Sequence, residues 1–173
     1  MRAITAAFID LMDTDLPVDV AALVTASGLD PGRLELEITE TALMFDPGRA
    51  LEVLDGLSRL GVKLSIDDFG VGYSSLNYLK RLPVDVLKID RSFVMNMEAS
   101  GEDAMIVRST IDLARNLGLR TVAEGVESTV TLESLRELGC DLAQGFVFSR
   151  PVPADALLEW ARAHRAVADP TLV

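Results

Sequence analysis

Apolar positions in this chain form short runs that alternate with longer helical patterns. The short runs each predict a strand and cover residues 33–39, 62–66, 84–90, 119–124 and 141–148, with residues 3–8 as a weaker sixth candidate. Helix-like stretches stop at a glycine that can adopt the left-handed conformation of a helix end, at Gly28, Gly61, Gly118 and Gly139. Strands and helices that alternate in this way predict right-handed crossovers and a parallel sheet.

Polar residues within the strands favour a closed barrel over an open sheet. In residues 33–39, three apolar residues face one side of the strand, whereas Glu35, Glu37 and Thr39 face the other. An open sheet between two helical layers would bury both sides, and no strand is followed by a GxGxxG or GxxxxGK[ST] sequence. We therefore expect an α/β fold of the TIM-type (β/α) barrel class. Because a full barrel takes about 250 residues, we expect it to be incomplete and to lack about the first two strands.

The composition and net charge of the chain limit the kinds of binding partner and site that it can have. The 173 residues carry 27 acids, 16 bases and a net charge of −11, which argues against a nucleic-acid polymer or an anionic membrane as partner. A small phosphate ligand is compatible with this charge if divalent cations are bound. No apolar run approaches the roughly 20 residues of a membrane span, and no signal peptide is recognisable, so we expect a cytoplasmic protein. The single cysteine, Cys140, and single histidine, His164, exclude an intrachain disulfide, a thiolate zinc site and Ser–His–Asp hydrolysis.

Charged and polar side chains recur where the predicted strands end. They are Glu37 and Glu40, Asp67 and Asp68, Lys88 and Asp90, Glu124 and Glu127, and Gln144. In barrel enzymes these strand ends form the mouth where the reaction takes place, and oxygen ligands suit Mg²⁺ or Mn²⁺. Two such ions about 4 Å apart would let one of the adjacent aspartates bridge them and would activate water for phosphodiester hydrolysis. Lys88 would orient the attacking hydroxide or neutralise phosphoryl charge.

Structural interpretations of the same residues stay open. Asp67 or Asp68 alone could cap the turn that follows, although Ser74 can cap the next helix instead. Glu35 and Lys63 are expected to form an internal ion pair rather than a site. Lys88 could simply neutralise a neighbouring acid, and Asp90 is expected to fix its own loop, so it is left out of the core site.

Five stretches together resemble a known family. They are "ELEITET", "DDFGVGYSSL", "LPVDVLKIDRSF", "TVAEGVE" and "AQGFVFSRP". In order and spacing they are similar to the EAL domain of cyclic di-GMP phosphodiesterases, over residues 1–165, with residues 166–173 as a C-terminal tail. The resemblance implies a βα barrel that hydrolyses cyclic di-GMP to linear pGpG with Mg²⁺ or Mn²⁺.

The resemblance also implies roles for individual residues. The family's metal ligands match Glu37, Asp67, Asp68 and Glu124, with Asp67 as the bridging ligand. Lys88 matches the lysine near the nucleophilic water and, with Asp67 and Glu124, forms the expected catalytic set. Polar residues that line the substrate site match Glu127 and Gln144. A loop that links metal binding to dimerisation, together with the glutamate that steadies it, matches Glu40, Phe69, Gly70, Gly72 and Ser74.

The chain departs from the family pattern in three places. The Glu-Ala-Leu signature, whose glutamate binds metal, does not occur in the 173 residues. Thr5 aligns with a ligand asparagine, and Val71 stands where threonine is common. We therefore expect low or no turnover from this chain, as a homodimer or as part of a longer sensor protein. The alternatives are a degenerate module that acts by binding cyclic di-GMP or a protein, and an unrelated metal-dependent barrel hydrolase.

Overall fold

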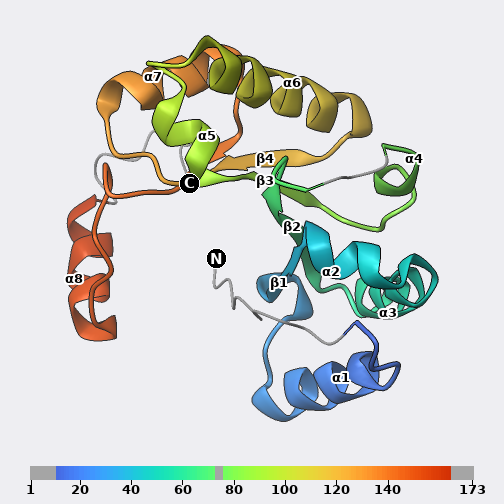
Figure 1. The fold of residues 1–173 in the computed structure, drawn as a ribbon. Coiled ribbons are helices and arrows are strands. Elements are labelled where there is room, and N and C mark those ends of the chain that lie inside the picture. Colours follow the sequence, from blue (N-terminus) through green and yellow to red (C-terminus); the bar gives the residue numbers. More distant parts are fainter. Residues whose placement is uncertain (1–10, 73–75, 165–173) are drawn as a thin grey trace.

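The computed structural model describes residues 11–72 and 76–164, which form a five-stranded parallel sheet with helices between the strands (Figure 1). The strands are β1 (Glu35–Thr39), β2 (Lys63–Phe69), β3 (Val86–Ile89), β4 (Arg120–Ala123) and β5 (Leu142–Ala143). The helices are α1 (Leu16–Ser27), the 3₁₀ turn η1 (Pro31–Arg33), α2 (Glu40–Phe45), α3 (Pro47–Arg59), α4 (Leu76–Leu79), α5 (Arg91–Asn96), α6 (Gly101–Leu117), α7 (Thr129–Leu138) and α8 (Ala154–His164). None of these described helices is long and apolar enough to cross a membrane.

The order of the strands favours a barrel wall. Neighbours in the sheet follow the chain, β1-β2-β3-β4-β5, and every pair is parallel. A doubly wound open sheet instead reverses its strand order at a switch point. An unreversed order with right-handed crossovers places the helices on one face, as in the outer ring of a βα barrel. The predicted parallel sheet is confirmed for the five stronger strand candidates, while residues 3–8 lie outside the described residues.

Two apolar clusters hold the helices against the sheet. One contains buried residues of β1, β2 and α3, among them Leu54, Leu57, Leu64 and Ile66. The other joins β3 and β4 to the helices α5, α6 and α7, and contains Ile89, Val107, Ile111, Ala123 and Leu135. Figure 1 shows the same division, with α2 and α3 beside the first two strands and α6 and α7 beside the last. The strands that carry the polar strand-end residues are therefore held in place by helices packed against the sheet.

Helix ends follow the glycine pattern closely. Gly28, Gly118 and Gly139 are left-handed C-caps of α1, α6 and α7, with φ of 64°, 73° and 78°. α3 ends two residues earlier than its glycine, and Gly61 then takes a φ of 84° in the turn into β2. These glycines supply the backbone conformation that side-chain-bearing residues rarely adopt. The four predicted helix ends are thus confirmed to within two residues.

The expected ion pair between Glu35 and Lys63 is wrong. The two residues are register neighbours on β1 and β2, but Lys63 Nζ lies 2.7 Å from Asp85 Oδ1. Asp85 also accepts a hydrogen bond of 3.1 Å from the Leu64 amide, which fixes it beside β2. Glu35 is 5% exposed, and its Oε2 atom has no hydrogen-bond partner. Alternation along a strand predicts the register, but not which of two nearby acids the lysine meets.

The predicted strand over residues 141–148 is also shorter than expected. Only Leu142 and Ala143 pair with β4, opposite Val122 and Ala123. Beyond them the chain turns against the loop that follows β4. Its apolar residues are consequently divided between this turn and the protein surface, where Phe146 is 48% exposed and Phe148 is 38% exposed.

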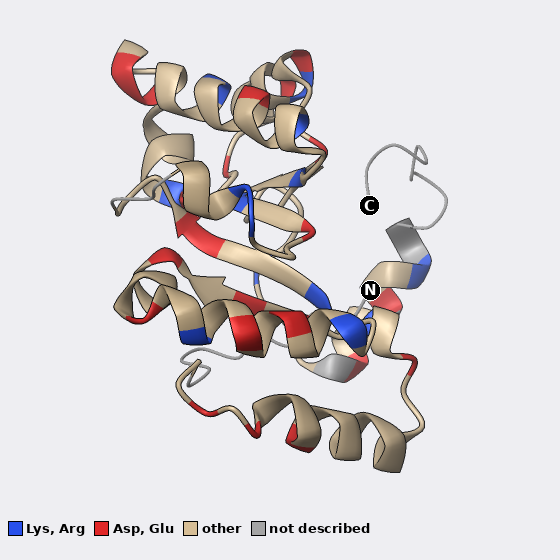
Figure 2. Cartoon of the chain, turned by 90° about the vertical axis from the view of Figure 1, so that its right-hand side faces the viewer, with Lys and Arg blue, Asp and Glu red and all other residues tan. Residues whose placement is uncertain are grey.

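Acidic and basic residues are interspersed along the helices on the face shown in Figure 2, rather than gathered into a basic patch.

The single thiol gives a test of this packing. Cys140 is partly buried, its Sγ lies 3.2 Å from the Leu142 carbonyl oxygen, and burial raises its pKa. Because the thiolate is the reactive form, we expect a thiol reagent at pH 8 to label the native chain at least about tenfold more slowly than the unfolded chain. The native rate should rise only above the pH at which ordinary thiols ionise. Equal rates for native and guanidinium-unfolded protein, measured by absorbance, would contradict the packing of β5.

Candidate active site

Acidic side chains from three strands meet around one lysine. Lys88 stands on β3, and its Nζ lies 3.0 Å from Glu37 Oε1 of β1, 3.2 Å from Asp67 Oδ1 of β2 and 2.6 Å from Glu124 Oε1 after β4. The Lys88 side chain is only 6% exposed. Parallel register brings these strand ends to one level, which is why residues far apart in the sequence share one site. We call Lys88, Glu37, Asp67 and Glu124 the lysine cluster.

Burial and neighbouring charges shift the pKa values in this cluster in opposite directions. Burial favours the neutral amine, but hydrogen bonds to Glu124 and Glu37 and the charges of Glu124 and Asp67 outweigh it and raise the pKa of Lys88. Burial also raises the pKa of Glu124, although Lys88 acts in the opposite direction. Lys88 is therefore a cation throughout the neutral range. Because one ammonium group is surrounded by three carboxyl groups, the cluster can attract further positive charge.

Asp68 lies next to Asp67 in the chain but enters a different environment. Its backbone has a φ of +53°, which is uncommon for a residue with a side chain but tolerated by aspartate. Burial, the charges of Asp67 and Asp90 and a hydrogen bond with the Asp90 carboxyl raise the pKa of Asp68. Asp90 caps α5 and accepts a 2.9 Å hydrogen bond from the Ser92 amide, as well as one from the Ser92 hydroxyl. Despite burial, hydrogen bonds from Ser92, Asp68 and the Arg91 backbone lower the pKa of Asp90, so the two neighbouring carboxyls are shifted in opposite directions.

The expectation that Asp90 fixes its own loop is confirmed by this cap. Its contact with Asp68 was missed, because a capping aspartate carries no sequence signal for a second partner.

Glu40 anchors the loop that follows β2. It is 3% exposed, and its Oε2 accepts hydrogen bonds of 3.2 Å from the amides of both Gly70 and Gly72. A Cβ at Gly72 would lie 2.9 Å from the Glu40 carboxyl carbon, so a side chain here would displace the Glu40 carboxylate from its present position. Phe69 ends β2 and is 7% exposed, while Ser74 lies outside the described residues, as does Thr5. The contribution of this loop to dimerisation stays a prediction.

Glu127 and Gln144 lie exposed beyond the ends of β4 and β5, in two loops joined through Val126. The Val126 amide donates to the Gln144 carbonyl at 3.0 Å, and the Val147 amide donates to the Val126 carbonyl at 3.0 Å. Gly145 makes this approach possible, because a Cβ there would overlap the Val126 amide nitrogen and carbonyl oxygen. Sequence reasoning missed Gly145, although a glycine directly after a strand-end glutamine signals a close backbone approach.

The residues at these strand ends fit divalent cations by their chemistry. All the predicted ligands are carboxylates, which hard cations prefer, and Asp67 Oδ1 is buried without a hydrogen bond of good geometry despite its ion pair with Lys88. Among residues 11–72 and 76–164, no three acidic, cysteine or histidine side chains are arranged to hold a metal ion. The donor set is therefore suitable, while its geometry is organised around the Lys88 ammonium.

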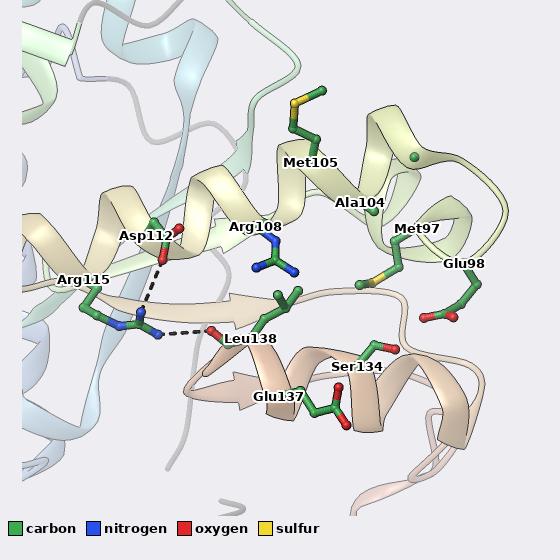
Figure 3. Close-up of a pocket in the computed structure, with 11 residues that line it drawn as sticks. Met97, Glu98, Ala104, Met105, Arg108, Asp112, Arg115, Ser134, Glu137 and Leu138 are labelled. Atoms are coloured by element: carbon green, nitrogen blue, oxygen red, sulfur yellow. Dashed lines mark hydrogen bonds and ion pairs between the residues drawn. The ribbon is translucent and has the colours of Figure 1, made fainter.

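A groove elsewhere on the molecule contains none of these residues. It has a volume of about 740 Å³ and runs between α6 and α7. In Figure 3, Arg115 crosses from α6 to the end of α7, pairing with Asp112 at 3.2 Å and donating to the Leu138 carbonyl at 3.1 Å. Because its arginines are interleaved with acids, it does not compete with the strand ends as a site for a phosphate ligand.

The chain that carries the lysine cluster is similar to known proteins. The family model described as "EAL domain" matches residues 4–151. This chain belongs to the EAL domain family. The cyclic di-GMP phosphodiesterase NbdA of Pseudomonas aeruginosa is 51% identical over 154 residues, which are 89% of this EAL chain and 20% of NbdA. The EAL chain thus spans about a fifth of the length of that relative.

Solved structures show the same fold. The PaMucR phosphodiesterase in complex with c-di-GMP is 44% identical, with a TM-score of 0.86, over 90% of the EAL chain and 63% of that structure. Klebsiella pneumoniae BlrP1 in a manganese and cy-diGMP complex is 37% identical, with a TM-score of 0.78, over 86% of the EAL chain and 38% of its own. The α/β barrel class and the EAL resemblance are both confirmed.

A matched pair of glycine substitutions tests the junction of the two exposed loops. Gly145→Ala forces a methyl group into the Val126 backbone, and we expect a loss of about 2 kcal/mol or more in the free energy of unfolding. Gly101→Ala, at the first residue of α6, meets nothing within 4 Å and should leave stability unchanged or slightly raised. Urea titrations followed by circular dichroism measure both, and a neutral Gly145→Ala would show that the two loops are not joined as described.

Proposed function

We propose that this EAL chain provides the metal-binding wall of a cyclic di-GMP phosphodiesterase, which hydrolyses cyclic di-GMP to linear pGpG with Mg²⁺ or Mn²⁺. The observation that carries the proposal is the convergence of Glu37, Asp67 and Glu124 on Lys88 at the carboxyl ends of neighbouring parallel strands. Support comes from relatives named as cyclic di-GMP phosphodiesterases, including NbdA and RocR. A further support is the calcium and manganese complexes of BlrP1 with the same dinucleotide.

Each residue of the wall has a definite task in this reaction. Glu37, Asp67, Asp68 and Glu124 would hold the two dications, which supply an activated water and neutralise charge on the phosphodiester. Lys88 cannot serve as a general base, because hydrogen bonds and charges from its acidic neighbours keep it protonated. It instead donates hydrogen bonds and stabilises the negative charge that develops on the phosphoryl oxygens. Glu127 and Gln144, which are exposed beyond the strands, would bind polar groups of the nucleotide.

Turnover by these 173 residues alone tests the departures from the family pattern. Without the Glu-Ala-Leu glutamate, and with Thr5 in place of asparagine, the dications would lack part of their usual ligands. We expect little or no pGpG when purified protein is incubated with cyclic di-GMP and Mn²⁺ and the products are separated by chromatography. Formation of pGpG at an ordinary enzymatic rate, about 10 s⁻¹, would falsify this expectation.

Calorimetry with cyclic di-GMP separates the related possibilities. Metal-dependent binding supports the phosphodiesterase site, whereas tight binding without metal indicates a receptor for the dinucleotide. The absence of binding with or without metal favours a protein-interaction role or a nonfunctional remnant. We place the chain within a longer signalling protein, as its 20% coverage of NbdA suggests, and we assign dimerisation to the loop after β2.

Loss of both adjacent aspartates tests the metal ligands directly. We expect Asp67→Asn/Asp68→Asn to abolish Mn²⁺ binding in calorimetry, because neutral amides replace two charged oxygen donors. The matched control is Asp112→Asn/Glu137→Gln, which removes the same charge from the groove between α6 and α7. Unchanged Mn²⁺ affinity in the first variant, with circular dichroism showing that it is folded, would remove these residues from the site.

A further inference from the structure

Lys88 differs from Lys63 and Arg115, whose ion pairs are far more exposed. Its Nζ lies within 3.2 Å of three carboxylates, and its side chain is 6% exposed. Lys63, by comparison, pairs with Asp85 alone at 2.7 Å, with side-chain exposures of 44% and 31%. Both lysines stand on strands of the same sheet, so the contrast lies in burial and in the number of acids.

The acids around Lys88 repel one another. Glu37 and Asp67 lie on β1 and β2, Glu124 follows β4 directly, and partly buried like charges this close are unfavourable without a cation between them. Lys88 stands between Leu87 and Ile89, which are both 0% exposed, so packing of β3 fixes its backbone independently of the acids. The ammonium therefore attracts the three carboxylates from the central strand of the described sheet.

The atoms that Lys88 engages are those that the proposed ligands would offer to a metal. Glu37 Oε1, Asp67 Oδ1 and Glu124 Oε1 all face Nζ. A dication bound to these residues would stand a few ångströms from a permanent positive charge with little water between them. Lys88 and the dications would thus attract the same carboxylates and repel each other.

We propose that Lys88 is the resident counter-ion of Glu37, Asp67 and Glu124. It holds these three carboxylates together when no dication is bound, and it lowers their affinity for dications. The inference rests on the proposed metal site and adds a role that operates in the absence of substrate. The affinity for dications then reflects a competition between Lys88 and the dication for the same carboxylates. Because Lys88 holds these carboxylates in place, they remain together at low metal concentration.

The test compares Lys88→Met with Lys63→Met, which lose the same charge and keep a similar aliphatic stem. In EDTA, we expect Lys88→Met to melt about 10 °C or more below the unsubstituted chain, because it leaves three partly buried acids without a counter-ion. In calorimetry, we expect its Mn²⁺ affinity to be about tenfold or more above that of the unsubstituted chain. Lys63→Met should change neither value appreciably, and Lys88→Arg, which keeps the charge, should retain the original Mn²⁺ affinity.

The other outcomes of this experiment each decide for or against the inference. Equal or weaker Mn²⁺ binding by Lys88→Met, with normal binding by the unsubstituted chain, overturns the counter-ion role and leaves the proposed metal site standing. If neither protein binds Mn²⁺, the metal site itself fails and the inference falls with it. Should Lys88→Met be unfolded in EDTA, recovery of its helical circular dichroism on addition of Mn²⁺ supports the inference, and failure to recover overturns it.

Discussion

The attraction between one buried ammonium and three carboxylates is the interaction on which the site depends. Lys88 occupies the central strand of the described sheet, and its partners come from β1, β2 and the end of β4. Strands that far apart in the sequence share a site only because parallel register brings their carboxyl ends to one edge. The apolar clusters behind the sheet fix the strands, and the ammonium then offsets a repulsion that those clusters alone would have to withstand. The packing of the strands and the charge of Lys88 therefore together determine the arrangement of these acids.

The loops around the cluster are held by backbone contacts that only particular residues permit. Glu40 binds two amides of the loop after β2, and a Cβ at Gly72 would press on its carboxylate. Gly145 brings the last loop against Val126 in the same way. Exposed residues such as Glu127 and Gln144 are thus carried on loops whose paths are fixed by hydrogen bonds. Rigid strands position the buried acids, and glycine-dependent contacts position the exposed ones.

Local patterns in the sequence predicted what depends on local physics. The strands, the glycine-capped helices and the acids at the strand ends follow from periodicity and turn chemistry. Tertiary choices were not predictable in the same way: Lys63 has Glu35 as its register neighbour but pairs with Asp85, which enters from the segment before β3. Apolar content suggested a long last strand, but the close approach at Gly145 turns the chain after Ala143. In both cases a contact between distant segments decided the outcome, and spacing along the chain carries no record of it.

The adjacent aspartates show how a strand end can give neighbouring acids different properties. Asp67 faces Lys88, whereas the left-handed backbone at Asp68 directs its carboxyl to Asp90. Asp67 therefore lies beside a cation, while burial and two nearby carboxylates raise the pKa of Asp68. Adjacent acids therefore need not share one environment: Asp67 has an ion pair with Lys88, whereas the surroundings of Asp68 disfavour its charged form. A dication that binds both would compete with the Lys88 ion pair at Asp67 and meet the neighbouring Asp90 carboxyl at Asp68, so the two acids would differ in how readily each accepts a metal.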